Sequence, residues 1–149
     1  MSKFEKLALA IVAILITVQF IQPEKNQGNY DLKPFLAETT PSNEVKRMLF
    51  NACFDCHSNN TQYPWYFQIT PLNFRIAHHI EEGKEHLNFS DWNSYNKDQK
   101  EHALEEVIEV MEEHEMPLKT YTWLHKEAKL TEAQVTQIID WARAAKAQQ

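Results

Sequence analysis

Residues 42–57, SNEVKRMLFNACFDCH, decide the fold of this chain. Apolar side chains recur in them three and four positions apart, which predicts an amphipathic helix. These side chains are Val45, Met48, Leu49, Ala52, Cys53 and Cys56. Ser42 is suited to cap the helix, and Glu44 is favourable in its first turn. The apolar stripe ends in both cysteines of the chain, so this helix carries whatever chemistry the thiols perform.

The last five of these residues, Cys53-Phe54-Asp55-Cys56-His57, have the pattern C-x-x-C-H. On a helix, Cys56 and His57 lie three and four positions after Cys53, so the three side chains leave one face. Two thiols in this arrangement can bond to the two vinyl groups of one haem, and the imidazole can ligate the iron. The pattern therefore predicts one covalent haem c per chain, held by Cys53, Cys56 and His57.

Three other roles for a C-x-x-C pair remain as alternatives. A thioredoxin-like redox site lies in a βαβ unit, and no segment here alternates convincingly as a strand. A structural disulfide between positions i and i+3 is the second alternative. A zinc site needs four ligands, and the chain has no second C-x-x-C. The two cysteines, His57 and one distant histidine would have to supply them.

Met116, in the stretch Glu115-Met116-Pro117-Leu118, is the candidate for the second axial ligand of the iron. Pro117 biases Met116 toward extended backbone, and a thioether on a loop can be aimed at the open face of a haem. A methionine opposite a histidine raises the reduction potential relative to two histidines. The alternatives are that Met116 fills the core, or that the ligand is His78, His79, His114 or His125.

The composition favours helices in the rest of the chain. Its 149 residues correspond to one domain, and its 2 glycines are too few for phosphate-binding loops or the turns of an all-β fold. A weak helical pattern covers about 72–87. Two stronger ones begin with capping boxes, at Asn96 with Gln99 and at Thr131 with Gln134, and the first of them stops before Pro117. The apolar stripe of the first is Leu104, Val107, Ile108 and Met111, and that of the second is Val135, Ile138, Ile139 and Ala142. We predict an all-α domain of about four helices at residues 43–149.

The N-terminus carries an apolar run, LALAIVAILITVQFI at residues 7–21, preceded by Lys3 and Lys6. This pattern is typical of an export signal, and from Phe4 the run approaches the ~20 residues of a bilayer span. No small-residue cleavage site follows, so we predict an uncleaved membrane helix at 1–22, with a cleaved signal as the alternative. The lysines place the domain on the periplasmic side of a bacterial inner membrane. Residues 23–42, with three prolines, are predicted to be a linker.

The formal net charge of −6 argues against nucleic-acid binding, which requires a basic surface. In the predicted helix between Asn96 and Pro117, most acidic side chains lie opposite the apolar stripe. They are Glu101, Glu105, Glu106, Glu109, Glu112, Glu113 and Glu115. They form either a solvated face or a docking surface for a basic redox partner, whose association would weaken with salt.

Four stretches of the chain resemble the small haem-binding domain found in exported bacterial proteins. They are NACFDCHSNNTQYPWY, HIEEGKEHLNFSDW, EMPLKTYTWLHKEAKLT and IIDWA, and the resemblance covers residues 43–145. It implies a cytochrome c-like, mostly helical fold with a covalent haem. It carries over Cys53, Cys56 and His57, and also Met116 in the E-M-P stretch.

These observations predict a membrane-tethered monohaem c-type cytochrome that carries single electrons between redox partners. The chain shows no constellation of acid, base and nucleophile, so we expect an electron carrier more than an enzyme. The alternatives are a haem sensor or a peroxidase-like enzyme, in which the sixth ligand is displaced, and a zinc-binding module.

Overall fold

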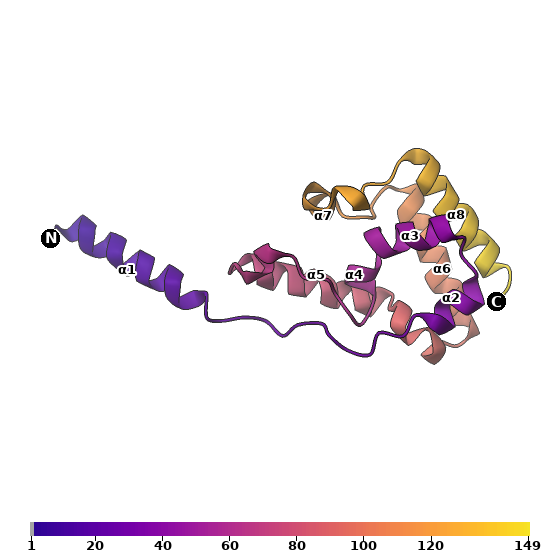
Figure 1. The fold of residues 1–149 in the computed structure, drawn as a ribbon, viewed down its shortest axis with the longest axis horizontal. Helices are drawn as coiled ribbons and strands as arrows, with labels where there is room; N and C mark the ends of the chain where they lie inside the picture. Colours follow the sequence, from indigo (N-terminus) through magenta and orange to yellow (C-terminus); the bar gives the residue numbers. More distant parts are fainter. Residues whose placement is uncertain (1) are drawn as a thin grey trace.

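The computed structural model describes residues 2–149, which form an all-helical protein, as the composition predicts (Figure 1). Within these residues β-pairing is limited to one bridge between Gln27 and Asn60. The α-helices are α1 (Lys3–Val18), α2 (Lys33–Thr39), α3 (Asn43–Ala52), α4 (Phe54–His57), α5 (Leu72–His86), α6 (Lys97–Glu112), α7 (Lys119–Leu124) and α8 (Glu132–Lys146). The 3-10 helices are η1 (Trp65–Gln68), η2 (Phe89–Ser94) and η3 (Lys126–Ala128).

The predicted N-terminal membrane helix is wrong. Helix α1 has 16 residues and ends at Val18, whereas a bilayer span needs about 20. Directly after the helix, the side-chain amide oxygen of Gln19 accepts from the Thr70 backbone N–H at 2.9 Å. Among residues 2–149, no helix combines the length and the apolar character needed to cross a membrane.

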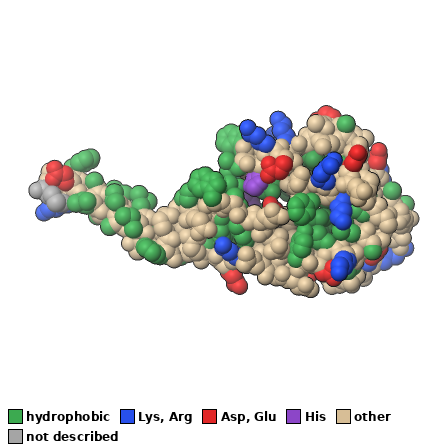
Figure 2. All heavy atoms as spheres, in the orientation of Figure 1, with side chains coloured by type: hydrophobic (Ala, Val, Ile, Leu, Met, Phe, Trp, Pro, Cys, Tyr) green, Lys and Arg blue, Asp and Glu red, His purple; other side chains and the backbone are tan. Residues whose placement is uncertain are grey.

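Helix α1 projects away from the other helices, and its apolar side chains lie on the surface (Figures 1 and 2). The segment after it continues along the domain toward α2 (Figure 1). The Gly28 amide donates to the Asn59 carbonyl, and the Thr61 amide donates to the Asn26 carbonyl. The N-terminal part of the predicted linker is therefore hydrogen-bonded to the chain that directly follows the C-x-x-C-H motif.

Helices α6 and α8 pack against each other and form one side of the core. Both begin with the predicted capping boxes, Asn96 with Gln99 and Thr131 with Gln134. Their predicted apolar stripes are largely buried. The buried members are Leu104, Ile108 and Met111 of α6, and Val135, Ile138, Ile139 and Ala142 of α8.

An aromatic cluster connects this core to the C-x-x-C-H motif. The Phe35 ring of α2 is fully buried, and its centroid lies 4.5–6.2 Å from those of Phe54, Phe89, Trp92 and Trp141. Phe54 is the second residue of the motif. The core therefore fixes the motif turn, because displacing the turn would expose the Phe54 side chain, which is only 3% exposed to solvent.

Candidate functional site

The C-x-x-C-H motif begins where two helices meet. Helix α3 ends at Ala52, and Cys53 has non-helical backbone angles (φ −125°, ψ −46°) before α4 starts at Phe54. The Cys53 carbonyl accepts from the amides of Cys56 (3.2 Å) and His57 (2.9 Å). The single predicted helix through Cys56 is therefore broken at Cys53, and the remaining motif residues form one separate turn.

Both cysteines are free thiols and are partly buried. Burial raises the pKa of Cys53 to about 12, and the neighbouring Cys56 adds to this shift. Burial, followed by the charge of Asp55, raises the pKa of Cys56 to about 11. Both sulfurs are therefore protonated at neutral pH in the folded, haem-free chain.

The imidazole of His57 is held in one orientation. Its Nδ1 lies 3.0 Å from the carbonyl oxygen of Leu87. A carbonyl only accepts, so Nδ1 carries the proton and Nε2 keeps its lone pair. Burial lowers the pKa of His57, which outweighs the opposing effect of the Leu87 hydrogen bond and favours the neutral ring. A neutral imidazole whose second nitrogen is fixed by a carbonyl is prepared to ligate a metal.

Gly83 brings α5 close to the motif. A Cβ at position 83 would lie 3.0 Å from the Cys56 carbonyl oxygen and 3.3 Å from the Cys56 Cβ. Glycine allows this approach without strain, because an added Cβ would require the Cys56 backbone to shift by a few tenths of an ångström. The Gly83 carbonyl then accepts from the Leu87 amide at the end of α5, so the same helix that packs on Cys56 supplies the acceptor for His57.

Asp55, inside the motif, joins it to two other segments. Its Oδ1 accepts from the Gln62 amide at 2.9 Å, and its Oδ2 accepts from the Tyr121 hydroxyl at 2.8 Å. The hydroxyl of Thr61 donates to the Asp55 carbonyl. Sequence reasoning missed Asp55 and Tyr121, because their pairing spans 66 positions and no local pattern marks it.

Met116 lies on the loop between α6 and α7. Its side chain is half-buried and packs against the hydrophobic core. Its backbone amide donates to the Val110 carbonyl at 3.4 Å, which ties it to the end of α6. Ligation of iron by Met116 stays a prediction.

The four alternative histidines have separate surroundings. His78 is largely exposed and faces Glu82, and His114 is exposed and faces Glu132. His125 Nε2 lies 2.6 Å from the Tyr66 hydroxyl. His79 has its Nδ1 near Glu82, while its Nε2 is buried and lacks a hydrogen-bond partner among the described residues. His79 is thus the one of the four with an unused buried nitrogen.

The alternative readings of the cysteine pair find little support in the geometry. In the part of the chain that the structure describes, no three or more His, Cys, Asp or Glu side chains are grouped so as to hold a metal ion. The two thiols are not joined as a disulfide. The same residues contain no βαβ unit.

Two free thiols and an oriented imidazole thus lie within five consecutive residues of an all-helical domain. A family model described as a haem-binding domain matches residues 13–144. The chain belongs to this haem-binding domain family. No curated protein and no solved structure matches it.

The residues present fit the group that the family binds. The side chains that would hold it are two thiols, which can bond to the vinyl groups of a haem, and an imidazole nitrogen and a loop thioether, which can ligate iron. The Leu87 carbonyl fixes the histidine tautomer in which Nε2 keeps its lone pair and would be able to bind a metal. The prediction of a haem cofactor is therefore confirmed at the level of the family.

Proposed function

We propose that this protein is a monohaem c-type cytochrome that carries single electrons. The haem would be bonded to Cys53 and Cys56, and His57 and Met116 would ligate its iron. The observation that carries the proposal is the hydrogen bond from His57 Nδ1 to the Leu87 carbonyl. It orients an imidazole that can ligate iron one residue away from a free thiol that can bond to the edge of a haem.

Bound haem supplies a one-electron couple at its iron. The chain's own residues do the rest. The Leu87 carbonyl orients His57 and increases its basicity. The Phe89 ring lies against the His57 ring, with centroids 6.3 Å apart. Phe89 also contacts Phe54 at a centroid distance of 5.2 Å, so the surroundings of the His57 ring are apolar on this side. Electron transfer needs no proton donor in such a site.

We also propose that the domain works on the periplasmic side of a bacterial inner membrane. The support is twofold. Lys3 and Lys6 precede an apolar run, which is typical of an export signal. Covalent haem attachment also takes place outside the bacterial cytoplasm. Fractionation of a producing strain, with the haem followed by its absorbance, tests this location.

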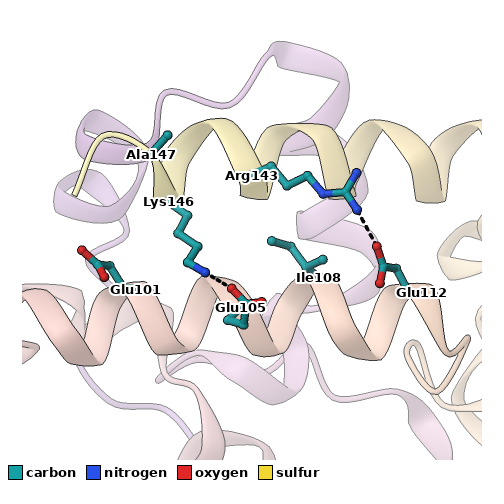
Figure 3. A pocket seen from close by; sticks show the side chains of 7 residues that line it. All are labelled: Glu101, Glu105, Ile108, Glu112, Arg143, Lys146 and Ala147. Carbon is teal, nitrogen blue, oxygen red and sulfur yellow. Dashed lines mark hydrogen bonds and ion pairs between the residues drawn. The ribbon is translucent and has the colours of Figure 1, made fainter.

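The acidic side of α6 is our proposed docking surface for a basic redox partner. Part of its charge is neutralised within the fold. Glu105 forms an ion pair with Lys146, and Glu112 forms one with Arg143, so that α8 lines the same groove (Figure 3). The remaining negative charge would accelerate association at low salt. Electron-transfer rates that do not change with ionic strength would exclude this surface.

The main experiment is a pyridine haemochrome spectrum of the purified chain after acid–acetone extraction. The chain is produced in a host with haem-attachment machinery. Haem that stays with the polypeptide supports the proposal, and a colourless protein contradicts it. Replacing both cysteines by alanine should release the haem into the acetone phase.

The axial histidine is tested separately. His57→Ala should retain covalent haem but lose the low-spin spectrum, because one axial ligand is missing. His78→Ala is the matched control, since this histidine is exposed and faces Glu82. Equal spectra for His57→Ala and the parent protein would assign the ligand to another residue.

A displaceable sixth ligand, as in a haem sensor or a peroxidase-like enzyme, is the second candidate function. The observation that favours it is that Met116 packs against the core. Rapid binding of carbon monoxide to the ferrous protein would support this candidate. A red-region charge-transfer band in the ferric protein, typical of a methionine ligand, would favour the electron carrier.

A further inference from the structure

Helix α7 directly follows the loop of Met116, and apolar burial does not hold it in place. None of its residues is buried. Its two largest apolar side chains, Trp123 and Leu124, are 85% and 60% exposed. A helix of six residues is also too short to be stable alone. Something other than hydrophobic packing therefore positions α7.

Polar contacts of Tyr121 provide this positioning. Its hydroxyl lies 2.8 Å from Asp55 Oδ2 and 3.4 Å from the Asn51 carbonyl oxygen. Its ring stacks on the His125 ring, with centroids 4.1 Å apart and planes 9° from parallel. His125 Nε2 in turn lies 2.6 Å from the Tyr66 hydroxyl of η1. Tyr121 thus connects α7 directly to the C-x-x-C-H motif.

The contact with Asp55 is the strongest of these connections on physical grounds. A hydrogen bond to an ionised carboxylate is about twice as strong as one between neutral groups. Burial and the charge of Asp55 hold the pKa of Tyr121 well above its ordinary value, so the hydroxyl keeps its proton and donates. The second carboxylate oxygen accepts from the Gln62 amide, which fixes the orientation of the Asp55 side chain.

The segment that bears Met116 is fixed at both ends by these contacts. At one end, the Met116 amide donates to the Val110 carbonyl of α6. At the other end, five residues later, Tyr121 is bonded to Asp55 between the two cysteines. Movement of this segment away from the motif requires one of the two ends to open.

We propose that the Tyr121–Asp55 hydrogen bond positions Met116 as the sixth ligand, by fastening its loop to the turn of Cys53, Cys56 and His57. This inference rests on the proposed function. Tyr121 is a positioning residue, because it acts through the loop. The bond makes the methionine-ligated state depend on a residue within the attachment motif itself.

The test is Tyr121→Phe in the full, haem-loaded chain. This change removes the hydroxyl and keeps the aromatic ring that stacks on His125. We expect an unchanged yield of covalent haem, a weaker ferric red-region band and a lower reduction potential. Carbon monoxide should bind the ferrous protein about tenfold faster, since losing a hydrogen bond to a charged group shifts an equilibrium by roughly that factor or more.

Three further variants separate positioning from general destabilisation. Tyr63→Phe is the matched control, because this tyrosine hydroxyl accepts from the Asn26 amide at 2.7 Å and does not contact α7. It should leave band, potential and carbon monoxide binding at parent values. Asp55→Asn keeps an acceptor for Tyr121, so it should retain more of the band than Asp55→Ala.

The outcomes distinguish this inference from the proposed function. A parent protein without covalent haem overturns both. A parent protein with haem but no methionine band overturns the role of Met116 and with it the positioning role of Tyr121. Band, potential and carbon monoxide binding unchanged in Tyr121→Phe, or changed equally in Tyr63→Phe, overturn the positioning role alone. If Tyr121→Phe does not fold, the two Asp55 variants decide. Ferric red-region bands of equal strength in Asp55→Asn and Asp55→Ala also overturn the positioning role.

Discussion

Gly83 is the residue at which α5 meets the C-x-x-C-H motif, and its replacement tests that close approach. Gly83→Ala should lower the free energy of unfolding by about 1 kcal/mol. Crowding against the Cys56 backbone destabilises the folded state by ~1–3 kcal/mol, whereas the higher helix propensity of alanine stabilises it by ~1 kcal/mol. Thermal unfolding followed by circular dichroism measures the change.

Gly28→Ala is the control for Gly83→Ala. A Cβ at Gly28 would meet Asn59 at 3.4 Å, an ordinary van der Waals distance. Its stability should change by no more than ~0.5 kcal/mol. A stabilised Gly83→Ala protein would show that the motif turn yields to the added methyl group.

Met116 has two possible roles, and Met116→Leu separates them. If Met116 only packs in the core, leucine conserves the volume and leaves the haem spectrum unchanged. If its sulfur ligates the iron, leucine abolishes the ferric red-region band and lowers the reduction potential, with covalent haem retained. We expect the second result. Met111→Leu is the control, because Met111 is a buried core methionine of α6, and it should leave the band intact.

At the scale of elements, the cap of α8 contributes measurably to stability. The Thr131 side chain accepts from the Gln134 amide, and the Gln134 side chain accepts from the Thr131 amide in return. Thr131→Ala should lower the free energy of unfolding by about 1 kcal/mol, as for other N-cap residues. Chemical denaturation measures it.

Thr136→Ala is the matched control for the cap. Thr136 is exposed in the middle of α8, and its hydroxyl donates to the Glu132 carbonyl. Alanine has the higher helix propensity, so this variant should be as stable as the parent or slightly more so. Equal losses in Thr131→Ala and Thr136→Ala would contradict the capping role.

Elements that depend on local interactions could be predicted from the sequence, whereas elements that depend on contacts between distant residues could not. The caps at Asn96 and Thr131 and the stripes of α6 and α8 are local patterns, and they were predicted correctly. The break at Cys53 was not, because it depends on Phe54 packing against Phe35, 19 positions away. Helix α7 was also missed, since its placement depends on Asp55 rather than on an apolar stripe.

The same limit applies to the candidate site. C-x-x-C-H is a contiguous pattern, so Cys53, Cys56 and His57 could be singled out from the sequence. Gly83 and Leu87, which shape the surroundings of His57, lie about 30 positions away and carry no motif. The membrane helix was wrong for a related reason. Hydropathy described the apolar run, but it could not indicate that the helix ends at Val18 or that Gln19 contacts Thr70 directly after it.

At the scale of the whole molecule, Asn26 fastens the N-terminal segment to the domain. Its Nδ2 donates to the Ser58 carbonyl and the Thr61 hydroxyl, and its Oδ1 accepts from the Lys84 ammonium, all within 2.9 Å. Asn26→Ala should therefore lower the free energy of unfolding by about 1–3 kcal/mol, since partly buried partners lose their hydrogen bonds.

Chemical denaturation of Asn26→Ala, beside Gln27→Ala, measures this contribution. Gln27 is exposed, and its replacement should change stability by less than ~0.5 kcal/mol. If the two variants were equally stable, the segment around Asn26 would not be an energetic part of the domain.

The burial of the two thiols has a consequence for biosynthesis. Cys53 and Cys56 are partly buried, and Gly83 brings the backbone of α5 close to Cys56. Attachment is therefore expected early, on a nascent chain in which α5 has not yet closed on the motif. Maturation would then precede folding, and a polypeptide that folds first would be a poor substrate for the attachment machinery.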